Sequence, residues 1–297
     1  PANLFPLLRA IRHPLGRHQR EFETRFCGGT MQILNTRSKG QIRFWKADGA
    51  ENLDELRREV GSSVIRRLKK DCLDLPEKTR VLRDSDVSAE MQDGYDQIVG
   101  RCMADFKMKA QAGLIMPESE SLVLLTAMRK AASAAKVDAA VELADEIVQN
   151  KGQAVVFSAF RDSARRVAEG FGVQVYDGGT PPEDRDRIVR AFQEGAQRVF
   201  SGTYAGGIGI TLTAASTVIL LDRPMTPGDA EQAEDRLHRI SQRNAVTAVW
   251  RRAFKVCRIL DELLMKKIKA IGEVLDAGGA VTAGQIVKEV FREEAPD

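Results

Sequence analysis

The stretch that decides the fold is AVVFSAFRDSARRVAEGFGVQVY, residues 154–176. Its first five residues form a short apolar run that is typical of a buried strand. The segment RDSARRVAEGF at 161–171 then predicts a helix, and VQVY at 173–176 predicts a second strand. A strand, a helix and a strand in this order form the repeating unit of a parallel α/β sheet.

The same alternation surrounds this stretch on both sides. A helix is expected at 134–150, and after residue 176 short, apolar, β-branched strands continue to alternate with helices. These later elements are a helix at 182–195, strands at 198–201 and 217–221, a helix at 229–240 and a strand at 246–250. Such strands belong to sheets that are covered on both faces, so the predicted fold class is α/β, a parallel sheet with helices on both faces.

The first part of the chain has a different pattern, which is mostly helical and basic over residues 1 to about 80. Residues 3–16, NLFPLLRAIRHPLG, predict a short apolar-periodic helix. Residues 52–71 predict one long amphipathic helix with Asn52 as its N-cap. The α/β part is therefore preceded by a mostly helical segment.

The remaining segments give weaker patterns. Residues 81–130 predict further helices, and the weakest stretch, 108–121, is interpreted as a linker or mobile loop. After the last predicted strand, a helix is expected at 255–271. The polar tail that follows has a short predicted helix near 285–292.

Composition limits the classes of function. The 297 residues carry a net charge of +3 and leave room for one large domain or two modest ones. Basic residues gather in short clusters, which suit a nucleic-acid or phosphate partner but equally suit solvated helix faces. The four cysteines and three histidines show no zinc-ligand spacing, and no apolar run could span a membrane. We therefore expect no metal site, no membrane contact and a reducing, cytoplasmic compartment.

The stretch QAEDRLHRISQR, residues 232–243, is the strongest candidate for chemistry. On a helix, Gln232, Arg236 and Arg239 would share one face because their positions follow the helical period. A guanidinium is permanently charged and binds phosphate oxygens in bidentate geometry, so two of them suit a phosphate ligand. The acidic residues nearby leave a second interpretation open, which is a salt-bridged surface helix.

A phosphate cradle of the P-loop type does not occur in this sequence, because no G-x-x-x-x-G-K-[ST] loop is present. GGIGIT at 206–211 lies between two predicted strands and is only a weak dinucleotide fingerprint. The chain opens at Pro1 without a methionine, which suggests a processed protein or a piece of a longer one. The two arginines therefore need a phosphate that is held elsewhere.

Several short motifs follow one another in a fixed order along the predicted α/β part. They are Phe157-Ser158; Asp177-Gly178-Gly179-Thr180 with Arg185 and Phe192; Thr203; Ala205-Gly206-Gly207-Ile208-Gly209; Leu212-Thr213 with Ala215; Asp222; Pro227; and Gln232 through Gln242. In this order they closely resemble the C-terminal RecA-like lobe of Swi2/Snf2-type DNA translocases in helicase superfamily 2. The combination and its order make the resemblance specific.

The resemblance continues on both sides of this lobe. Residues 49–80 look like the end of the family's first lobe, and residues 259–270 look like the helix that braces the two lobes. The likeness covers roughly residues 4–271. It divides the chain into a helical tail of RecA-like lobe 1 (1–80), a helical protrusion and linker (81–130), RecA-like lobe 2 with the brace helix (131–272) and a C-terminal tail (273–297).

The resemblance implies a motor whose ATP, with Mg²⁺, binds in the cleft between the two lobes. The Walker motif and the acidic metal motif would then precede Pro1, and we expect this chain alone not to turn over ATP. By resemblance, Arg239 is the first choice for an arginine finger and Arg236 for a second γ-phosphate contact, while Gln232 would help align the cleft. The residues assigned to the cofactor side are Gly206, Gly207, Gly209 and Asp222.

The resemblance also implies double-stranded DNA as a partner, contacted by Ser158, Thr180, Arg185 and Thr203. Hydroxyl groups after successive strands suit sequence-independent phosphate contacts, although they are also common caps and turn formers. Arg185 could instead pair with an adjacent acidic residue. Further expected partners are the N-terminal RecA-like lobe of the same protein and a protein bound through domains outside this chain, in a nucleoid-associated setting.

The sequence departs from the family pattern at a few motif positions. Thr211 stands where the family has asparagine, Tyr204 where it often has arginine, and Ser241 where it has glycine, while Met225-Thr226-Pro227 replaces W-N-P. These changes suggest a divergent, bacterial member of the family.

Two other interpretations stay open. An RNA helicase lobe of the same superfamily is disfavoured by the block at 49–80 and by Gln242, and stimulation by duplex DNA over RNA would decide against it. A non-catalytic DNA- or protein-binding module could share the fold. Salt-sensitive DNA binding without ATP turnover in any longer form would favour that second alternative.

Overall fold

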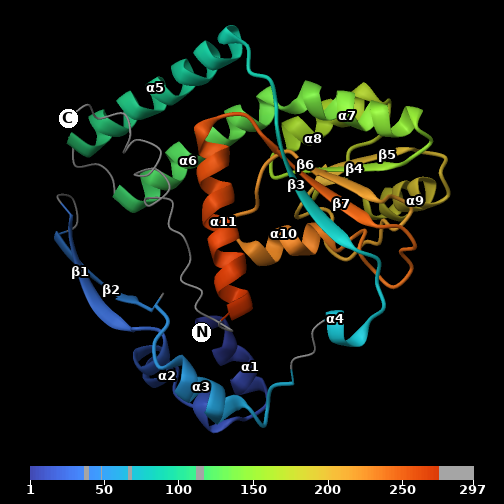
Figure 1. Ribbon diagram of the computed structural model, residues 1–297. Coiled ribbons are helices and arrows are strands. Elements are labelled where there is room, and N and C mark those ends of the chain that lie inside the picture. Colours follow the sequence, from blue (N-terminus) through green and yellow to red (C-terminus); the bar gives the residue numbers. More distant parts are fainter. Residues whose placement is uncertain (37–39, 48, 66–68, 112–116, 274–297) are drawn as a thin grey trace.

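The structure of the chain, a computed structural model, describes residues 1–36, 40–47, 49–65, 69–111 and 117–273. Its largest unit is a sheet of five parallel strands in the order β3-β7-β6-β4-β5 (Figure 1). The strands are β3 (Lys78–Asp84), β4 (Ala154–Ser158), β5 (Val199–Thr203), β6 (Thr217–Leu220) and β7 (Val246–Arg252). The predicted α/β class with a parallel sheet is confirmed.

Helices cover both faces of this sheet, which explains why its central strands are apolar throughout. Alternate residues of a strand point to opposite faces. Accordingly, Val155 and Phe157 of β4 pack in the cluster that α9 and α10 cover, while Val156 packs in the cluster that α7 and α8 cover. The helices are α7 (Val137–Gln149), α8 (Arg161–Gly170), α9 (Pro182–Gln193) and α10 (Pro227–Glu234).

Two predicted elements of this part differ from the structure. The predicted strand at 173–176 is wrong, because only Tyr176 pairs, in an isolated parallel bridge with Gly202. The predicted helix at 229–240 is too long, because α10 ends at Glu234 and tight turns follow.

The strand β3 spans the predicted boundary of the chain at residue 80. It lies along β7 over its whole length, from Lys78 opposite Val246 to Asp84 opposite Arg252. A boundary at residue 80 would cut this strand, so the sheet of the α/β unit includes residues that were assigned to the tail of a first lobe. The segment before β3 is therefore joined directly to the edge of the sheet.

Three long helices pack beside the sheet. They are α5 (Ala89–Gln111), α6 (Pro117–Ala135) and α11 (Lys255–Glu273). Tyr95 of α5 stacks on Phe254 at 4.0 Å between ring centroids, within an apolar cluster shared by all three helices. The expected linker at 108–121 is helical at both ends, and its middle, 112–116, lies outside the described residues. No described helix is long and apolar enough to cross a membrane.

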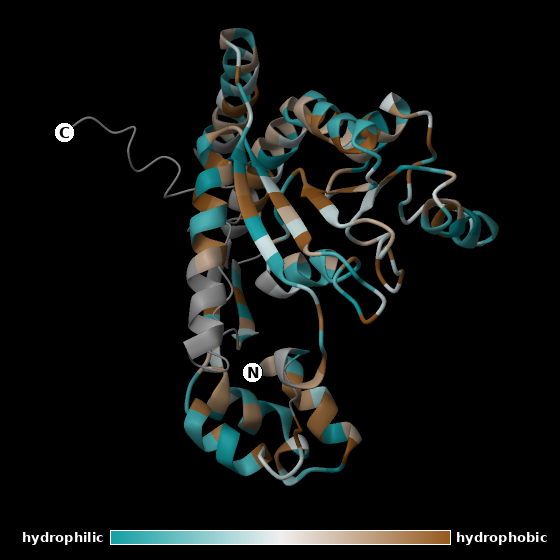
Figure 2. Cartoon of the chain, turned by 45° about the vertical axis from the view of Figure 1, so that its right-hand side comes forward, coloured by the Kyte–Doolittle hydropathy of each residue, from teal (hydrophilic) through white to brown (hydrophobic). Residues whose placement is uncertain are grey.

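The N-terminal residues form a separate small unit, which both views place beside the layers of the sheet (Figures 1 and 2). Its own core contains Phe5, Leu8, Phe22 and Phe26. The elements are η1 (Ala2–Leu4), α1 (Phe5–Ala10), η2 (Pro14–Gly16), α2 (Gln19–Phe26), β1 (Thr30–Thr36), β2 (Gly40–Lys46), α3 (Leu53–Val60) and α4 (Lys69–Cys72).

This unit is less helical than the sequence indicated. The strands β1 and β2 pair as an antiparallel hairpin within the segment expected to be helical. The single helix predicted at 52–71 is replaced by α3 and α4. Asn52 does precede α3, but its side chain donates to the Arg25 carbonyl oxygen at 2.7 Å instead of capping the helix. The predicted tail helix near 285–292 lies outside the described residues.

Candidate functional site

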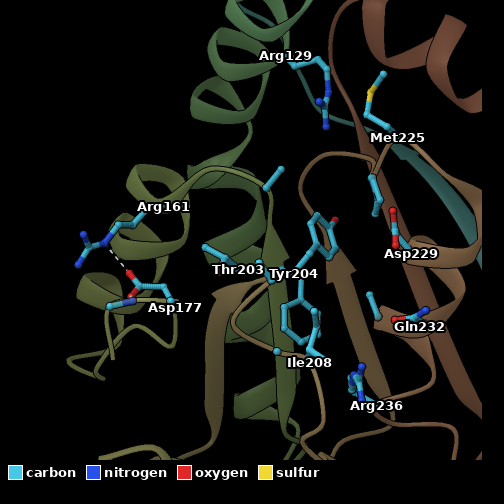
Figure 3. Close-up of a pocket in the computed structure, with 18 residues that line it drawn as sticks. Arg129, Arg161, Asp177, Thr203, Tyr204, Ile208, Met225, Asp229, Gln232 and Arg236 are labelled. Atoms are coloured by element: carbon cyan, nitrogen blue, oxygen red, sulfur yellow. Dashed lines mark hydrogen bonds and ion pairs between the residues drawn. The ribbon is translucent and has the colours of Figure 1, made fainter. Parts of the chain in front are cut away.

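A cavity of about 650 Å³ opens beyond the carboxyl ends of β4, β5 and β6, where ligands commonly bind in open α/β sheets (Figure 3). The loops that follow these strands supply most of its wall, including Thr203 and Tyr204 after β5 and Met225 after β6. Helix α10 closes the wall with Gln232. We call this space the first cavity.

A second cavity of about 560 Å³ is lined mainly by residues between 232 and 241. Gln232 and Arg236 line both cavities, and Arg239 lines the second one together with Thr211 and Lys69. The structure therefore brings the three residues of the predicted arginine face together. We call residues 234–239 the arginine turn.

The arginine face does not arise in the way that was predicted. Helix α10 ends at Glu234, and the next bonds are short-range: Arg236 N–H donates to the Ala233 carbonyl at 3.3 Å, and Leu237 N–H donates to the Glu234 carbonyl at 3.1 Å. Such bonds tighten the last turn of a helix. The prediction that a continuous helix places Arg236 and Arg239 on one face is therefore wrong. Both residues nevertheless line the second cavity.

Arg236 is the unusual member of this group. It is only 8% exposed, and within the described residues its side chain has no hydrogen-bond or ion-pair partner. Burial, and then the nearby Arg239 guanidinium, lowers the pKa of Arg236, and Asp235 opposes this shift. Because a guanidinium stays charged in proteins, Arg236 is a buried cation that lacks an anion.

Arg239 is held more firmly. Its Nε donates to the Asp235 carbonyl oxygen at 3.0 Å, and its Nη1 donates to the Thr211 hydroxyl at 2.9 Å. Thr211 belongs to the glycine-rich loop after β5, so this bond joins the loop to the arginine turn, as does the bond from the Leu212 N–H to the Arg236 carbonyl at 2.8 Å. The side chain that replaces the family's asparagine thus has a direct structural role.

The glycines of that loop are needed for contacts within the chain. A Cβ on Gly206 would lie 2.7 Å from the Asp177 Cα, and one on Gly207 would lie 2.8 Å from the Phe157 ring. Gly209 has a φ of +86°, a conformation that favours glycine. The sequence analysis assigned these three residues to the cofactor side. The close approaches of Gly206 and Gly207 are to neighbouring protein segments, whereas a Cβ on Gly209 would meet nothing within 4 Å.

Asp222 and Ser158, which the sequence analysis assigned to the cofactor and DNA sides, are bonded to each other. The Asp222 carboxylate is buried and accepts from the Ser158 hydroxyl at 2.6 Å, the Ser133 hydroxyl at 3.0 Å and the Ala159 N–H at 2.9 Å. Ser158 is itself fully buried. Asp222 and Ser158 therefore connect the end of β4 to the residues that follow β6.

Thr180 and Arg185 also act within the chain. The Thr180 hydroxyl accepts from the Asp177 N–H at 2.9 Å, and the Arg185 Nε donates to the Thr180 carbonyl at 3.0 Å. The Arg185 guanidinium also lies over the Tyr176 ring, 5.6 Å from its centroid. Thr203 is the one predicted DNA contact that lines the first cavity, and its hydroxyl accepts from Gly206 N–H at 3.1 Å.

Two cations of the first cavity were missed by the sequence analysis. Arg161, at the start of α8, is 66% exposed along its side chain and pairs with Asp177 at 2.5 Å (Figure 3). Arg129 of α6 lies over the Phe160 ring, 5.6 Å from its centroid, and donates to the Arg223 carbonyl. The position of Arg161 directly after a predicted strand was a usable signal. Arg129 carried none, because its helix was assigned to a protrusion.

Comparison with known proteins identifies the family to which this domain belongs. Residues 135–241 match the family model described as the helicase conserved C-terminal domain, and this match spans the strands and turns that form both cavities. The chain is also 28% identical, over 92% of its length, to the SWI/SNF-related matrix-associated actin-dependent regulator of chromatin subfamily A-like protein 1 homolog of Caenorhabditis elegans. The chain contains a Swi2/Snf2-family helicase C-terminal domain.

Other relatives agree with this assignment. The DNA annealing helicase and endonuclease ZRANB3 of Mus musculus is 30% identical over 76% of the chain. The chain spans 39% of the length of the Caenorhabditis elegans relative and 21% of the mouse relative. It therefore corresponds to less than half of these proteins.

Solved structures show the same RecA-like fold. The C-terminal part of the Fun30 ATPase domain covers 74% of this chain and is itself covered to 99%, with a TM-score of 0.58 and 19% identity. The Sulfolobus solfataricus SWI2/SNF2 ATPase core in complex with dsDNA covers 94% of this chain and is covered to 60%, with a TM-score of 0.56 and 20% identity. The α/β unit is therefore a RecA-like helicase lobe 2.

Tyr204 shows how this Swi2/Snf2 lobe accommodates a departure from the family pattern. Its hydroxyl donates to the Asp222 carbonyl, and its ring lies 5.8 Å from the Phe157 ring, between centroids. Burial raises the pKa of the Tyr204 hydroxyl well above its ordinary value. Tyr204 is thus a neutral side chain that closes the wall of the first cavity where the family often carries a cation.

Proposed function

We propose that this chain is the C-terminal motor lobe of an ATP-dependent translocase on double-stranded DNA. Its two arginines would meet the phosphates of ATP bound by the N-terminal RecA-like lobe of the same protein. The single observation that carries this proposal is Arg236, a buried cation without an anion, beside Arg239 at the second cavity.

The residues of the second cavity suit the anionic end of ATP. Arg236 has free donors, and the Arg239 guanidinium is oriented by Thr211, so the pair offers charge and direction together. Swi2/Snf2 ATPases use ATP, whose hydrolysis supplies the free energy of movement. We assign the Mg²⁺ that accompanies ATP to the N-terminal lobe. Gln232, at the boundary of the two cavities, would align the nucleotide side with the DNA side.

We assign the first cavity to the DNA backbone. Arg161 and Thr203 line it, and the exposed Arg161 side chain suits a sequence-independent phosphate contact. The solved Sulfolobus solfataricus relative is described as a complex with dsDNA, which supports duplex DNA as the partner. Ser158, Thr180 and Arg185 would then support the shape of this surface without touching the phosphates.

The decisive experiment measures ATP turnover by the longer protein that contains this chain, with and without duplex DNA. Arg236→Ala and Arg239→Ala are expected to reduce DNA-stimulated turnover by about 100-fold or more, the order found for groups that stabilise transition-state charge. Arg165→Ala is the matched control, because Arg165 is exposed on α8 and pairs only with Glu169 among the described residues. The isolated chain is expected to show no turnover.

The rival interpretations predict other results. Stronger stimulation by RNA than by duplex DNA would support an RNA helicase lobe. Salt-sensitive DNA binding with no turnover in the longer protein would support a non-catalytic binding module. Turnover by the isolated chain that is lost in Arg239→Ala would overturn the assignment of the phosphate site to two lobes.

A further inference from the structure

The segment that leads into β3 is fastened directly to the arginine turn. We call residues 69–80 the strap. Arg80 donates to both oxygens of the Glu234 carboxylate, at 2.7 Å and 2.9 Å, and the Lys78 ammonium lies 3.1 Å from the same carboxylate. Glu234 is fully buried. The last residue of α10 is therefore neutralised by two cations of the strap.

The strap also holds the next residues of the turn. Asp235 pairs with Lys69 of α4, and the Lys78 ammonium donates to it at 3.2 Å. The His238 Nε2 lies 2.7 Å from the Pro76 carbonyl oxygen. Among the described residues, these contacts fall on Glu234, Asp235 and His238, and no hydrogen bond or ion pair joins the strap to the Arg236 side chain.

The opposite side of Glu234 is anchored in the sheet. The Trp250 indole N–H donates to the Glu234 carboxylate at 3.0 Å, and the guanidinium groups of Arg80 and Arg223 lie over the Trp250 ring at 5.3 Å and 4.6 Å from its centroid. Arg223 is paired with Asp261 of α11. Glu234 is therefore held on two sides, by Arg80 of the strap and by Trp250 of the sheet. Asp235, in contrast, is paired with Lys69, whose side chain is about half exposed.

We propose that the strap is a positioning element that keeps Arg236 free to receive a phosphate. Asp235 is adjacent to Arg236 and already interacts with its charge. While Lys69 and Lys78 occupy the Asp235 carboxylate, this carboxylate does not pair with Arg236. Loss of the strap contacts frees Asp235 to pair with Arg236 and to occupy its donors. This inference rests on the proposed function, because it assumes that Arg236 acts on a phosphate.

Along the chain, the strap connects residues 1–65 to the sheet. It begins at Lys69, the first residue of α4, which pairs with Asp235 of the arginine turn. The strap would thus make the availability of Arg236 depend on the placement of the preceding lobe. A motor with two lobes needs such a dependence if its arginines are to act only after closure.

The test uses anion binding by the isolated chain and turnover by the longer protein. Lys69→Gln combined with Lys78→Gln is expected to weaken tripolyphosphate binding to the chain by about fivefold, the upper effect of a partly exposed ion pair. In the longer protein the same variant lowers kcat by a similar factor and leaves the DNA concentration for half-maximal stimulation unchanged. Circular dichroism verifies that the variants are folded.

A suppressor separates positioning from simple loss of charge. Asp235→Asn, added to the two lysine substitutions, removes the freed carboxylate and is expected to restore both readouts. Glu231→Gln adds the same charge on an exposed residue of α10, one turn earlier, and is expected not to restore them. Equal restoration by both, or tripolyphosphate binding unaffected by the lysine substitutions, would overturn the inference. Failure of the unsubstituted chain to bind tripolyphosphate, with Arg236→Ala turning over normally in the longer protein, would instead overturn the proposed function.

Discussion

Replacing Arg236 with methionine is expected to stabilise the chain while it removes the proposed phosphate site. Arg236 is 8% exposed and has no pairing partner within the described ranges, so folding withdraws most of this side chain from water with only the nearby Asp235 charge in compensation. Methionine keeps most of the aliphatic stem and removes the charge. We expect a gain of about 1 kcal/mol in the free energy of unfolding, as is common when an uncompensated charge is replaced by an apolar group. This gain corresponds to a rise in Tm of roughly 2–4 °C.

Arg239→Met provides the matched comparison. Its side chain makes two hydrogen bonds, to the Asp235 carbonyl at 3.0 Å and to the Thr211 hydroxyl at 2.9 Å. Loss of both is expected to destabilise the chain by about 1–2 kcal/mol. Two arginines only three residues apart are thus expected to change stability in opposite directions.

Urea unfolding measured by Trp250 fluorescence, in a Trp45→Phe background, tests this expectation. Trp250 is fully buried in β7 and bonded to Glu234, so its emission reports the sheet and the arginine turn. Sulfate is expected to raise the unfolding midpoint of the parent chain more than that of Arg236→Met, because the variant keeps only Arg239, whose guanidinium is already bonded to the Asp235 carbonyl and the Thr211 hydroxyl. If Arg236→Met unfolds at lower urea than the parent, or if sulfate stabilises both equally, Arg236 is not an unpaired cation.

Other expectations can be checked in the same chain or in the longer protein. Thr211→Val removes the hydrogen bond from Arg239 and is expected to lower DNA-stimulated turnover by about fivefold, whereas Thr211→Asn is expected to retain activity. Equal turnover by the two variants would refute the role of this bond. Gly206→Ala is expected to destabilise the chain by about 2 kcal/mol, whereas Gly178→Ala, whose Cβ meets nothing within 4 Å, stays within about 0.5 kcal/mol in thermal unfolding. Arg161→Ala is expected to reduce the salt slope of duplex DNA binding by about one, whereas Ser158→Ala leaves it unchanged and costs about 1–2 kcal/mol of stability. An unchanged slope for Arg161→Ala would remove this residue from the DNA contacts.

The strands of the sheet could be predicted because each one corresponds to a short, continuous run of residues in the sequence. AVVFS at 154–158 and TVILL at 217–221 are continuous apolar runs, and only strands buried on both faces require such runs. In the structure, Thr203 and Arg236 line the same cavity at the carboxyl ends of these strands. VQVY at 173–176 failed because the chain makes only one bridge there, at Tyr176, before it turns at Asp177.

The features that were not predicted depend on contacts between distant segments. The end of α10 is fixed by Arg80, which lies 154 positions earlier in the chain, and by Trp250 in β7. The burial of Ser158 depends on Asp222, 64 positions later. A hydroxyl at a strand end looks the same in sequence whether it faces solvent or a buried carboxylate. Only the folded arrangement distinguishes the two cases.

Glu234, Asp235 and Arg236 are consecutive in the chain, but among the described residues only the two carboxylates have ion-pair partners. The strap supplies cations to both carboxylates, so their charges are neutralised inside the lobe. Arg236 has no pairing partner among the described residues, and the adjacent Asp235 carboxylate only partly opposes the effect of burial on its pKa. The cost of its burial persists until an external anion arrives. On the proposed function, closure of the partner lobe would deliver that anion, and the relief of the Arg236 charge would itself favour the closed state.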